Sequence, residues 1–303
     1  MLFLGVDGGQ SATTAMVADE SGSVLGVGRA GPCSRLVEAL GDSVSAACRQ
    51  AGVEARFTAA CLGLSGGAEG REAQVRALIR ADRYCMSHDA AVALTGATGG
   101  EPGIITVAGT GSIAYGRNAA GKDARAGGWG HIVGDEGSAF DLVRQAVRAA
   151  LRFEEGWGPP TSLRDALLEH TGAASANDLL HRFYTPDFQK SKIAAIAPMI
   201  GEAATNGDTV ARELLHNAAG ELAIITTAVR MQLFVPGEKV RVAFVGGVFG
   251  NGTLRERFRT LLELEDGVTV NPPEFTPAAG ALIEAFQLAG LRIKPRNSAR
   301  VET

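Results

Sequence analysis

The stretch from Gly103 to Ser138 constrains the fold of this 303-residue chain more than any other. It opens with an apolar, β-branched run, Ile104 to Val107, which is typical of a buried strand. The run leads into Gly109–Ser112, where two glycines flank a hydroxyl and leave backbone N–H groups available to an anion. A second alternating segment, Ile113 to Arg117, follows directly. The stretch therefore predicts two strands joined by an anion-binding turn.

The glycines of this turn also match, by letters alone, the dinucleotide-binding fingerprint, with Gly109, Gly111 and Ala114 in its three places. That fingerprint requires a helix after the glycines, because the helix N-terminus holds the pyrophosphate. Here the residues after the turn alternate and run into a second turn at 118–121, so the segment is predicted to be a hairpin. We therefore exclude a nicotinamide or flavin site.

Further along the stretch, the backbone carries almost no side chains except one large aromatic ring, Trp129, among three glycines. An acidic pair, Asp135 and Glu136, then precedes a helix expected from Phe140 to Phe153. Glycine-rich turns next to carboxylates favour a phosphate and polyol site over a packing motif.

The N-terminus shows a related arrangement. A strand from Leu2 to Val6 ends in Asp7-Gly8-Gly9, and two further strands are expected over 12–18 and 24–28. In such a hairpin, hydroxyls and N–H groups can meet phosphate oxygens while Asp7 faces a bound cation. The alternative is a tight hairpin in which Asp7 only forms the turn, and the residues alone leave both interpretations open.

Asp89 follows a short strand expected over 84–86 and opens a helix. An Asp in this place can be a helix N-cap, and it can equally be a base that faces the glycine-rich turns. The two roles are compatible in one residue.

The rest of the chain completes an α/β pattern in which strands and helices alternate, and the opening order of elements recurs loosely from Ile104 onward. Helices are expected over 37–50, 73–79, 193–204, 209–233, 254–262 and 277–288, and strands over 59–64, 240–245 and 268–270. The segment 156–188 is expected to be irregular and partly helical. Duplication of one domain is a structural hypothesis, because the two halves share no close sequence repeat.

Composition narrows the classes of function. The formal net charge is −4 and no basic run occurs, which argues against a nucleic-acid partner. No apolar run reaches the length of a membrane span and the N-terminus lacks a leader pattern, so we expect a cytoplasmic protein without a membrane partner. The four cysteines form no C-x-x-C pair, which favours free thiols over a metal or cluster site.

Together, these segments resemble the actin, hexokinase and Hsp70 ATPase superfamily. Within it the chain resembles the N-acetylglucosamine kinase branch of the BadF/BadG/BcrA/BcrD-type ATPases, above all in residues 127–138, GGWGHIVGDEGS. The resemblance covers nearly the whole chain and implies two ribonuclease H-like domains that flank a nucleotide cleft. The first is expected over 1–106, joined by the C-terminal helix at 277–290, and the second over 107–276. No G-x-x-x-x-G-K-[ST] phosphate loop is present.

The resemblance also implies a mechanism, ATP-dependent phosphorylation of the 6-hydroxyl of an amino sugar by a homodimeric enzyme. Asp89 would be the base and Asp7 would hold Mg²⁺. The residues implied to bind ATP are Gly8, Gly9, Gln10, Ser11, Thr13, Gly109, Thr110, Gly111, Ser112, Gly246, Gly247 and Val248. Those implied to surround the sugar are Ser34, Ser65, Gly66, Asp89, Gly128, Trp129, Gly130 and Asp135.

One departure from the branch concerns the sugar. Its kinases usually carry an Asn after the third strand that contacts a sugar hydroxyl, whereas this chain has GPCSRL at 31–36. The choice among N-acetylglucosamine, glucosamine, N-acetylmuramic acid and glucose therefore stays open. A competing class is the activator ATPase of benzoyl-CoA reductase and 2-hydroxyacyl-CoA dehydratase, which would bridge an iron–sulphur cluster through Cys33 and Cys61. A module that binds ATP without turnover is a third possibility, against which Asp89 argues.

Overall fold

The computed structural model describes residues 1–67, 69–185 and 189–297, and it divides the chain into two compact units. Unit 1 comprises Met1–Ile105, Gly116–Lys122 and the chain from Asn271 onward. Unit 2 comprises Thr106–Tyr115 and Asp123–Val270. Unlike the division expected from the sequence, the structure also places 116–122 in the first unit.

Unit 1 is built on a five-stranded mixed sheet with the order β3-β2-β1-β4-β5. The first three strands are antiparallel neighbours, whereas β4 and β5 run parallel to β1. The bounds are β1 Leu2–Gly8, β2 Thr13–Asp19, β3 Val24–Ala30, β4 Arg56–Leu64 and β5 Arg80–His88. Parallel strands end at the same edge, so the residues that follow β1, β4 and β5 are brought together.

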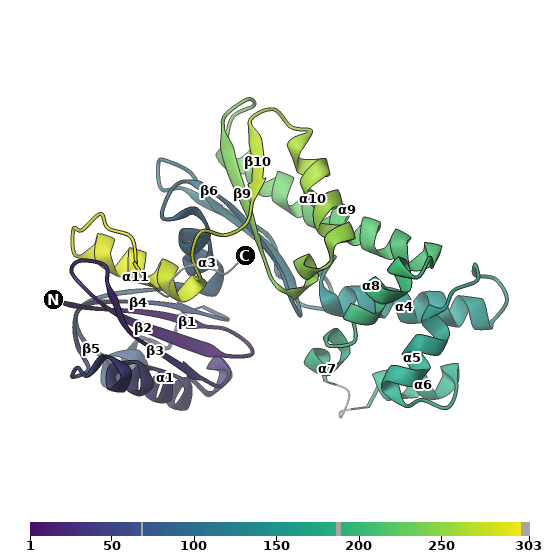
Figure 1. The fold of residues 1–303 in the computed structure, drawn as a ribbon, viewed down its shortest axis with the longest axis horizontal. Helices are drawn as coiled ribbons and strands as arrows, with labels where there is room; N and C mark the ends of the chain where they lie inside the picture. The colour runs from purple at the N-terminus through teal and green to yellow at the C-terminus, as the bar shows by residue number, and fades with distance from the viewer. Residues whose placement is uncertain (68, 186–188, 298–303) are drawn as a thin grey trace. The chain divides into compact units, whose positions relative to one another are not determined.

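Helices cover both faces of this sheet (Figure 1). One face is packed by α1 (Leu36–Ala51), which is preceded by the short helix η1 (Cys33–Arg35), and the other by α3 (Asp89–Thr98) and α11 (Pro277–Leu288). The α11 helix approaches closely because small residues face it: a Cβ at Gly5 would lie 2.4 Å from the Leu282 nitrogen. The C-terminal helix therefore belongs to the core of the first unit. A further short helix, α2 (Glu72–Leu78), lies between β4 and β5 in the sequence.

The second sheet has the order β10-β9-β6-β7-β8. If β6 to β10 are numbered one to five and the order is read from β8, it is three, two, one, four, five, which is the order of the first sheet. The two units therefore repeat one topology. The bounds are β6 Gly103–Ala108, β7 Ser112–Arg117, β8 Asp123–Gly127, β9 Val240–Val245 and β10 Val268–Asn271. The repeat supports the duplication hypothesis and the expected class of two α/β domains.

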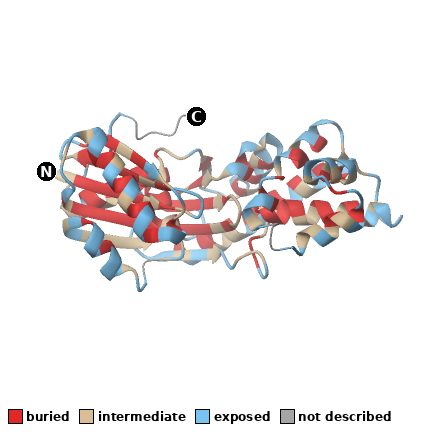
Figure 2. Cartoon of the chain, turned by 90° about the horizontal axis from the view of Figure 1, so that it is seen from below, coloured by how far each residue is buried: buried red, intermediate tan, exposed pale blue. Residues whose placement is uncertain are grey.

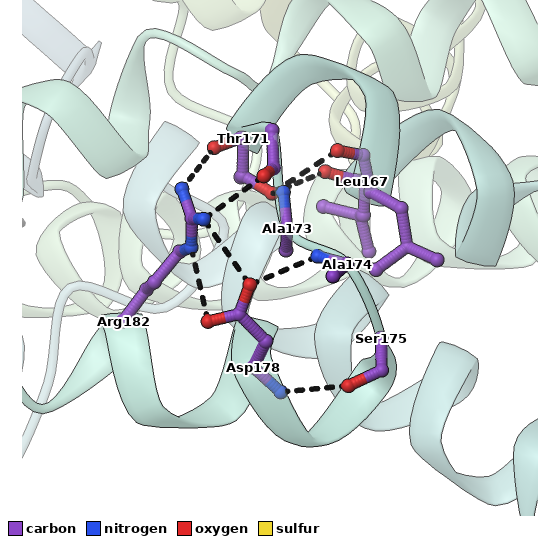
Figure 3. A network of polar contacts seen from close by, with 9 residues as sticks. Leu167, Thr171, Ala173, Ala174, Ser175, Asp178 and Arg182 are labelled. Carbon is purple, nitrogen blue, oxygen red and sulfur yellow. Dashed lines mark hydrogen bonds and ion pairs between the residues drawn. The ribbon is translucent and has the colours of Figure 1, made fainter.

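The helices of unit 2 are α4 Ala139–Glu154, α5 Leu163–Thr171, α6 Ala176–Phe183, α7 Lys190–Ala194, α8 Pro198–Thr205, α9 Thr209–Leu233 and α10 Gly252–Glu263, with a short turn of helix, η2, at Gly247–Gly250. Strands β6 and β7 and the inner sides of the long helices are largely buried (Figure 2), whereas β8 has no buried residue. The α5–α6 pair is closed by Arg182, which donates to the Thr171 carbonyl and pairs with Asp178 (Figure 3).

Three expectations about the elements were wrong. The helix expected over 193–204 is two helices, α7 and α8, and the second begins at Pro198, which has no N–H to donate to the Ala194 carbonyl and so cannot continue the first helix. Strand β8 was not predicted, because its alternation is masked by glycine and charged residues. Strand β5 spans nine residues instead of three. Among the described residues, no helix combines the length and the apolar character that a membrane crossing needs.

Candidate active site

The carboxyl edge of the sheet in unit 1 gathers the acidic residues that the sequence singled out. Register pairs Gly8 of β1 with Leu64 of β4, and Leu64 with His88 of β5. Asp7 therefore lies at the end of β1, Ser65 directly after β4 and Asp89 directly after β5. The Ser65 N–H donates to the Gly8 carbonyl at 2.8 Å, which ties the first two of these segments together.

Burial, and second the negative charge of Asp89, together raise the pKa of Asp7 to about 7. Two carboxylates thus lie close enough for the charge of Asp89 to disfavour ionisation of Asp7. A divalent cation or a positively charged partner would relieve this repulsion, so the pair fits a metal-binding and proton-accepting role.

Asp89 is the first residue of α3, and the N-cap is His88. The N-cap interpretation of Asp89 was therefore wrong. Its Oδ1 accepts only the N–H of the adjacent Ala90, at 2.9 Å. Among the described residues Asp89 makes no ion pair, which leaves its carboxylate available to a substrate hydroxyl.

The turn after β1 is closed by the Gly9 N–H, which donates to the Ala12 carbonyl at 2.9 Å. Gln10 and Ser11 are exposed in this turn. Thr13 is fully buried, and its hydroxyl oxygen has no hydrogen-bond partner among the described residues. A phosphate oxygen could reach this orphaned hydroxyl only after a local shift of the turn, so the assignment of Thr13 to ATP stays a prediction.

Cys33 lies in the segment 31–36, in which the resembling kinases usually carry an Asn. Its N–H donates to the Gly9 carbonyl at 3.0 Å, and a Cβ at Gly8 would lie 2.9 Å from its sulphur. Burial raises the pKa of this thiol. Ser34 is exposed beside it. Cys61, the other cysteine proposed for a cluster, is fully buried in the sheet core, which disfavours the activator ATPase.

Arg71 is a residue of this site that the sequence analysis missed. Its Nη1 donates to the Ser65 carbonyl at 3.0 Å and lies 3.8 Å from the Cys33 sulphur. The only signal in the sequence is a basic residue a few positions after the Ser65–Gly67 turn.

In unit 2, the turn Gly109–Ser112 joins β6 directly to β7, which confirms the hairpin and excludes the dinucleotide fingerprint. The Gly109 N–H donates to the Gly111 carbonyl at 2.9 Å, and the Ser112 hydroxyl donates to the Glu136 carbonyl at 2.6 Å. Ser138 then caps α4 by accepting the Asp141 N–H. Hydrogen bonds thus connect the Gly109–Ser112 turn to the residues that precede α4.

Asp135 is the residue that fixes this connection. Its backbone has φ 61°, its exposed fraction is 4%, and its Oδ2 pairs with Lys190 Nζ at 2.7 Å. Its Oδ1 accepts the Ser112 N–H at 3.4 Å, and a Cβ at Gly111 would lie 2.7 Å from Oδ2. Both carboxylate oxygens are therefore engaged inside unit 2, so contact with a sugar hydroxyl requires Lys190 to share one of them. Nothing in the sequence pointed to Lys190.

The segment 127–134 contrasts with Asp135, because it presents apolar side chains outward. Trp129 is 66% exposed and Ile132 81% exposed, and the Arg125 guanidinium lies 5.0 Å from the centre of the Trp129 ring. Gly128 and Gly130 have φ of 73° and 83°, which favours glycine at both positions. An exposed ring on a glycine-supported backbone is a surface on which the apolar face of a sugar can stack.

The end of β9 carries the third predicted motif. Gly246 has φ 114°, and a Cβ there would lie 2.2 Å from the Ala108 carbonyl oxygen, so only glycine fits. A Cβ at Gly247 would meet nothing within 4 Å, whereas Val248 is buried. This open backbone beside the Gly109 turn fits an adenosine, and the role stays a prediction.

A family model described as the BadF/BadG/BcrA/BcrD ATPase family matches residues 4–285 of the chain. An N-acetylmuramic acid/N-acetylglucosamine kinase of Clostridium acetobutylicum is 38% identical over 194 residues, which are 64% of this chain and 63% of that protein. An N-acetyl-D-glucosamine kinase of Dictyostelium discoideum is 29% identical over 81% of this chain and 85% of its own length.

Among solved structures, a candidate N-acetylglucosamine kinase from Chromobacterium violaceum is similar with a TM-score of 0.77 and 28% identity, over 93% of this chain and 98% of that one. A glucokinase of the ROK family from Streptomyces griseus has a TM-score of 0.56 at 19% identity, over 95% and 99% of the two chains, and shows the shared fold.

Proposed function

The chain belongs to the BadF/BadG/BcrA/BcrD ATPase family, and from this premise we propose that it is an ATP-dependent kinase for the 6-hydroxyl of a 2-acetamido hexose. The observation that carries the proposal is the pair Asp7 and Asp89 at one sheet edge, where the charge of Asp89 opposes ionisation of the buried Asp7. The names of the Clostridium and Dictyostelium relatives support the substrate class.

In this proposal, Asp89 accepts the proton of the sugar hydroxyl as its oxygen attacks the terminal phosphorus of ATP. General-base assistance of this kind contributes roughly 10²–10⁴-fold to the rate. Asp7 would hold Mg²⁺, which would neutralise phosphate charge there. Because a cation beside Asp7 also lowers the pKa of Asp7, the ionised form is favoured in the loaded enzyme.

Backbone groups of both glycine-rich turns hold the nucleotide. The N–H groups of Thr110 and Gly111 in unit 2, and those of Gln10 and Ser11 in unit 1, donate to phosphate oxygens, and the Gly247 backbone receives the adenosine. The Trp129 ring stacks on the sugar, and Asp135 accepts hydrogen bonds from its hydroxyls. The second candidate substrate is glucosamine, the substrate named for a relative from Vibrio cholerae that is 26% identical over 75% of this chain.

We also infer a cytoplasmic homodimer from the family resemblance, and light scattering on the purified protein tests the oligomeric state. The activity itself is tested by ADP release from ATP with N-acetylglucosamine, glucosamine, glucose or no sugar. The proposal expects turnover that depends on a 2-amino or 2-acetamido hexose. ADP release at the same rate without sugar would contradict it.

A further inference from the structure

Two of the free cysteines, Cys61 and Cys85, lie side by side in the sheet of unit 1. Register pairs Cys61 of β4 with Cys85 of β5, and residues paired in this way project from the same face of a sheet. Both side chains belong to the apolar cluster that α11 forms on that face. Cys33 and Cys48 belong to the cluster on the opposite face. Cys61 and Cys85 therefore form a dithiol apart from the other two cysteines.

The spacing of the two strands is close to the spacing that a disulfide needs. Neighbouring strands lie about 4.8 Å apart, and the Cα atoms of a disulfide are roughly 4.4–6.8 Å apart. The two thiols already share a hydrogen bond, which raises the pKa of Cys61 and lowers the pKa of Cys85. The sulphur atoms can therefore be joined without a change of register.

The two thiols differ in access and in acidity. Cys85 lies on the edge strand and is partly exposed, whereas Cys61 lies on the adjacent inner strand and is fully buried. The hydrogen bond with Cys61 lowers the pKa of Cys85 against the effects of burial and of Glu284, and Arg117 adds to the lowering. Glu284 is held by Arg117 at 2.8 Å and by the Thr95 hydroxyl at 2.6 Å. Because the thiolate is the nucleophile, Cys85 is the thiol that reacts first and Cys61 the one that resolves.

We propose that Cys61 and Cys85 are a redox site, which a hydroperoxide oxidises to a disulfide that slows the phosphoryl transfer. The chemistry of the pair is independent of the kinase function proposed above, whereas its effect on turnover rests on that function.

The reaction has two steps. The Cys85 thiolate attacks one oxygen of hydrogen peroxide, the O–O bond breaks, and the second oxygen leaves as water after taking a proton, so that Cys85 becomes a sulfenic acid. The Cys61 sulphur then attacks the Cys85 sulphur, the S–O bond breaks, and the departing hydroxide takes the Cys61 proton to form a second water. In sum, two thiols give two electrons and two protons to the peroxide and become one disulfide.

A disulfide between these strands acts on the candidate active site through the backbone. Cys61 is four residues before Ser65, and Cys85 is four residues before Asp89. The Cβ atoms of a disulfide lie about 3.8 Å apart, less than the strand spacing of about 4.8 Å, so the bridge draws β4 and β5 together near their carboxyl ends. A displacement of about 1 Å in a reacting group can cost about 100-fold in rate. The same strain makes the bridge easy to reduce, so the loss of activity is reversible.

The test treats the full chain with hydrogen peroxide and then with dithiothreitol. Oxidised wild type is expected to lose two hydrogen atoms in mass, to fall from four free thiols to two, and to give the tryptic peptides of Cys61 and Cys85 as a linked pair. Its kcat for N-acetylglucosamine should fall about tenfold or more and recover with dithiothreitol.

Three variants separate the roles of the cysteines. Cys85→Ser should show no such mass change and should keep its kcat in peroxide, because the accessible thiol is gone. Cys61→Ser should stop at the sulfenic acid of Cys85, which dimedone labels. Cys48→Ser is the matched control, since it removes a buried thiol from the opposite face of the sheet and should respond to peroxide as wild type does.

Wild type alone decides the inference if a variant does not fold. Addition of oxygen at Cys85 without loss of the Cys61 thiol overturns it, and so does a disulfide that leaves kcat unchanged. Equal loss of kcat in Cys85→Ser and wild type assigns the inactivation to another residue and also overturns it. Untreated wild type that phosphorylates no sugar refutes the kinase function instead, while the mass and the thiol count still decide whether the disulfide forms.

Discussion

At the scale of single residues, the site is defined by a few charged side chains whose ion pairs and charge neighbours set their properties. The charge of Asp89 raises the pKa of Asp7, Arg71 forms no ion pair among the described residues, and the buried Asp135 pairs with the partly exposed Lys190. The sequence pointed to the three carboxylates, because each follows a strand or precedes a helix beside glycines. It did not point to Lys190, whose partner lies 55 positions away in the chain, and for Arg71 it offered only the short distance to the Ser65–Gly67 turn.

The raised pKa of Asp7 predicts how stability depends on pH in the absence of nucleotide and divalent cations. A carboxyl group whose pKa rises from 3.8 to about 7 on folding stabilises the fold below pH 3.8, and this contribution is lost as pH rises through about 7. Asp7→Asn should therefore be more stable than wild type at pH 8 by up to about 4 kcal/mol, with a smaller difference at pH 5. Urea denaturation in EDTA at both pH values measures it.

Asp89→Asn serves as the control for that experiment. It removes the negative charge that raises the pKa of Asp7, so the pH dependence of wild-type stability should weaken in this variant. Parallel pH dependences for wild type and Asp7→Asn would show that Asp7 titrates as an ordinary carboxyl group.

The Asp135–Lys190 pair distinguishes a structural role from a sugar-binding role. Lys190→Met leaves Asp135 buried and without its cation, which should cost about 2–4 kcal/mol of unfolding free energy, and Asp135→Ala should cost a similar amount. If Asp135 contacts the sugar, Asp135→Ala should also raise KM for the sugar, at temperatures where both variants are folded, far more than Lys190→Met does. Equal KM values in the two variants would leave Asp135 with the structural role alone.

At the scale of elements, periodicity predicted the long helices and strands well, and the bounds of α9, β9 and α11 match the expected ones. The periodicity predicted one helix over 193–204, but Pro198 interrupts the apolar pattern and starts a separate helix, α8. The glycine-rich turns were placed correctly, and at Gly111, Gly128 and Gly246 a positive φ or a close approach permits little besides glycine.

The turn after β9 gives a prediction with an internal control. A valine at Gly247 meets no protein atom within 4 Å of its Cβ, so the fold should tolerate it, while the side chain enters the space predicted for adenosine. Gly247→Val should raise KM for ATP at least about tenfold and change KM for the sugar little. Steady-state kinetics with each substrate varied in turn measures both values.

Gly246→Val is the contrasting variant. Its Cβ would lie 2.2 Å from the Ala108 carbonyl oxygen at φ 114°, so thermal unfolding should occur at a markedly lower temperature. If Gly247→Val raises both KM values equally, the turn is structural and the nucleotide binds elsewhere.

At the scale of the whole molecule, the repeated strand order shows that one topology was used twice. In the sequence, only the order of the expected elements indicated this repeat, because two sheets can have the same strand order while their amino-acid sequences differ. The return of the chain at Asn271 to the first unit also depends on packing: α11 fits there since Gly5 and Gly280 allow backbone contact with β1 and α3.

The measurement that tests the account most directly is ADP release by wild type and Asp89→Asn, each with and without N-acetylglucosamine, together with ATP binding by calorimetry. The account predicts that wild type turns over only with sugar. It also predicts that Asp89→Asn binds ATP normally but loses about 10²-fold or more in kcat, because an amide cannot accept the hydroxyl proton. Sugar-independent turnover, or an Asp89→Asn variant that keeps about a tenth of the wild-type kcat, would contradict it.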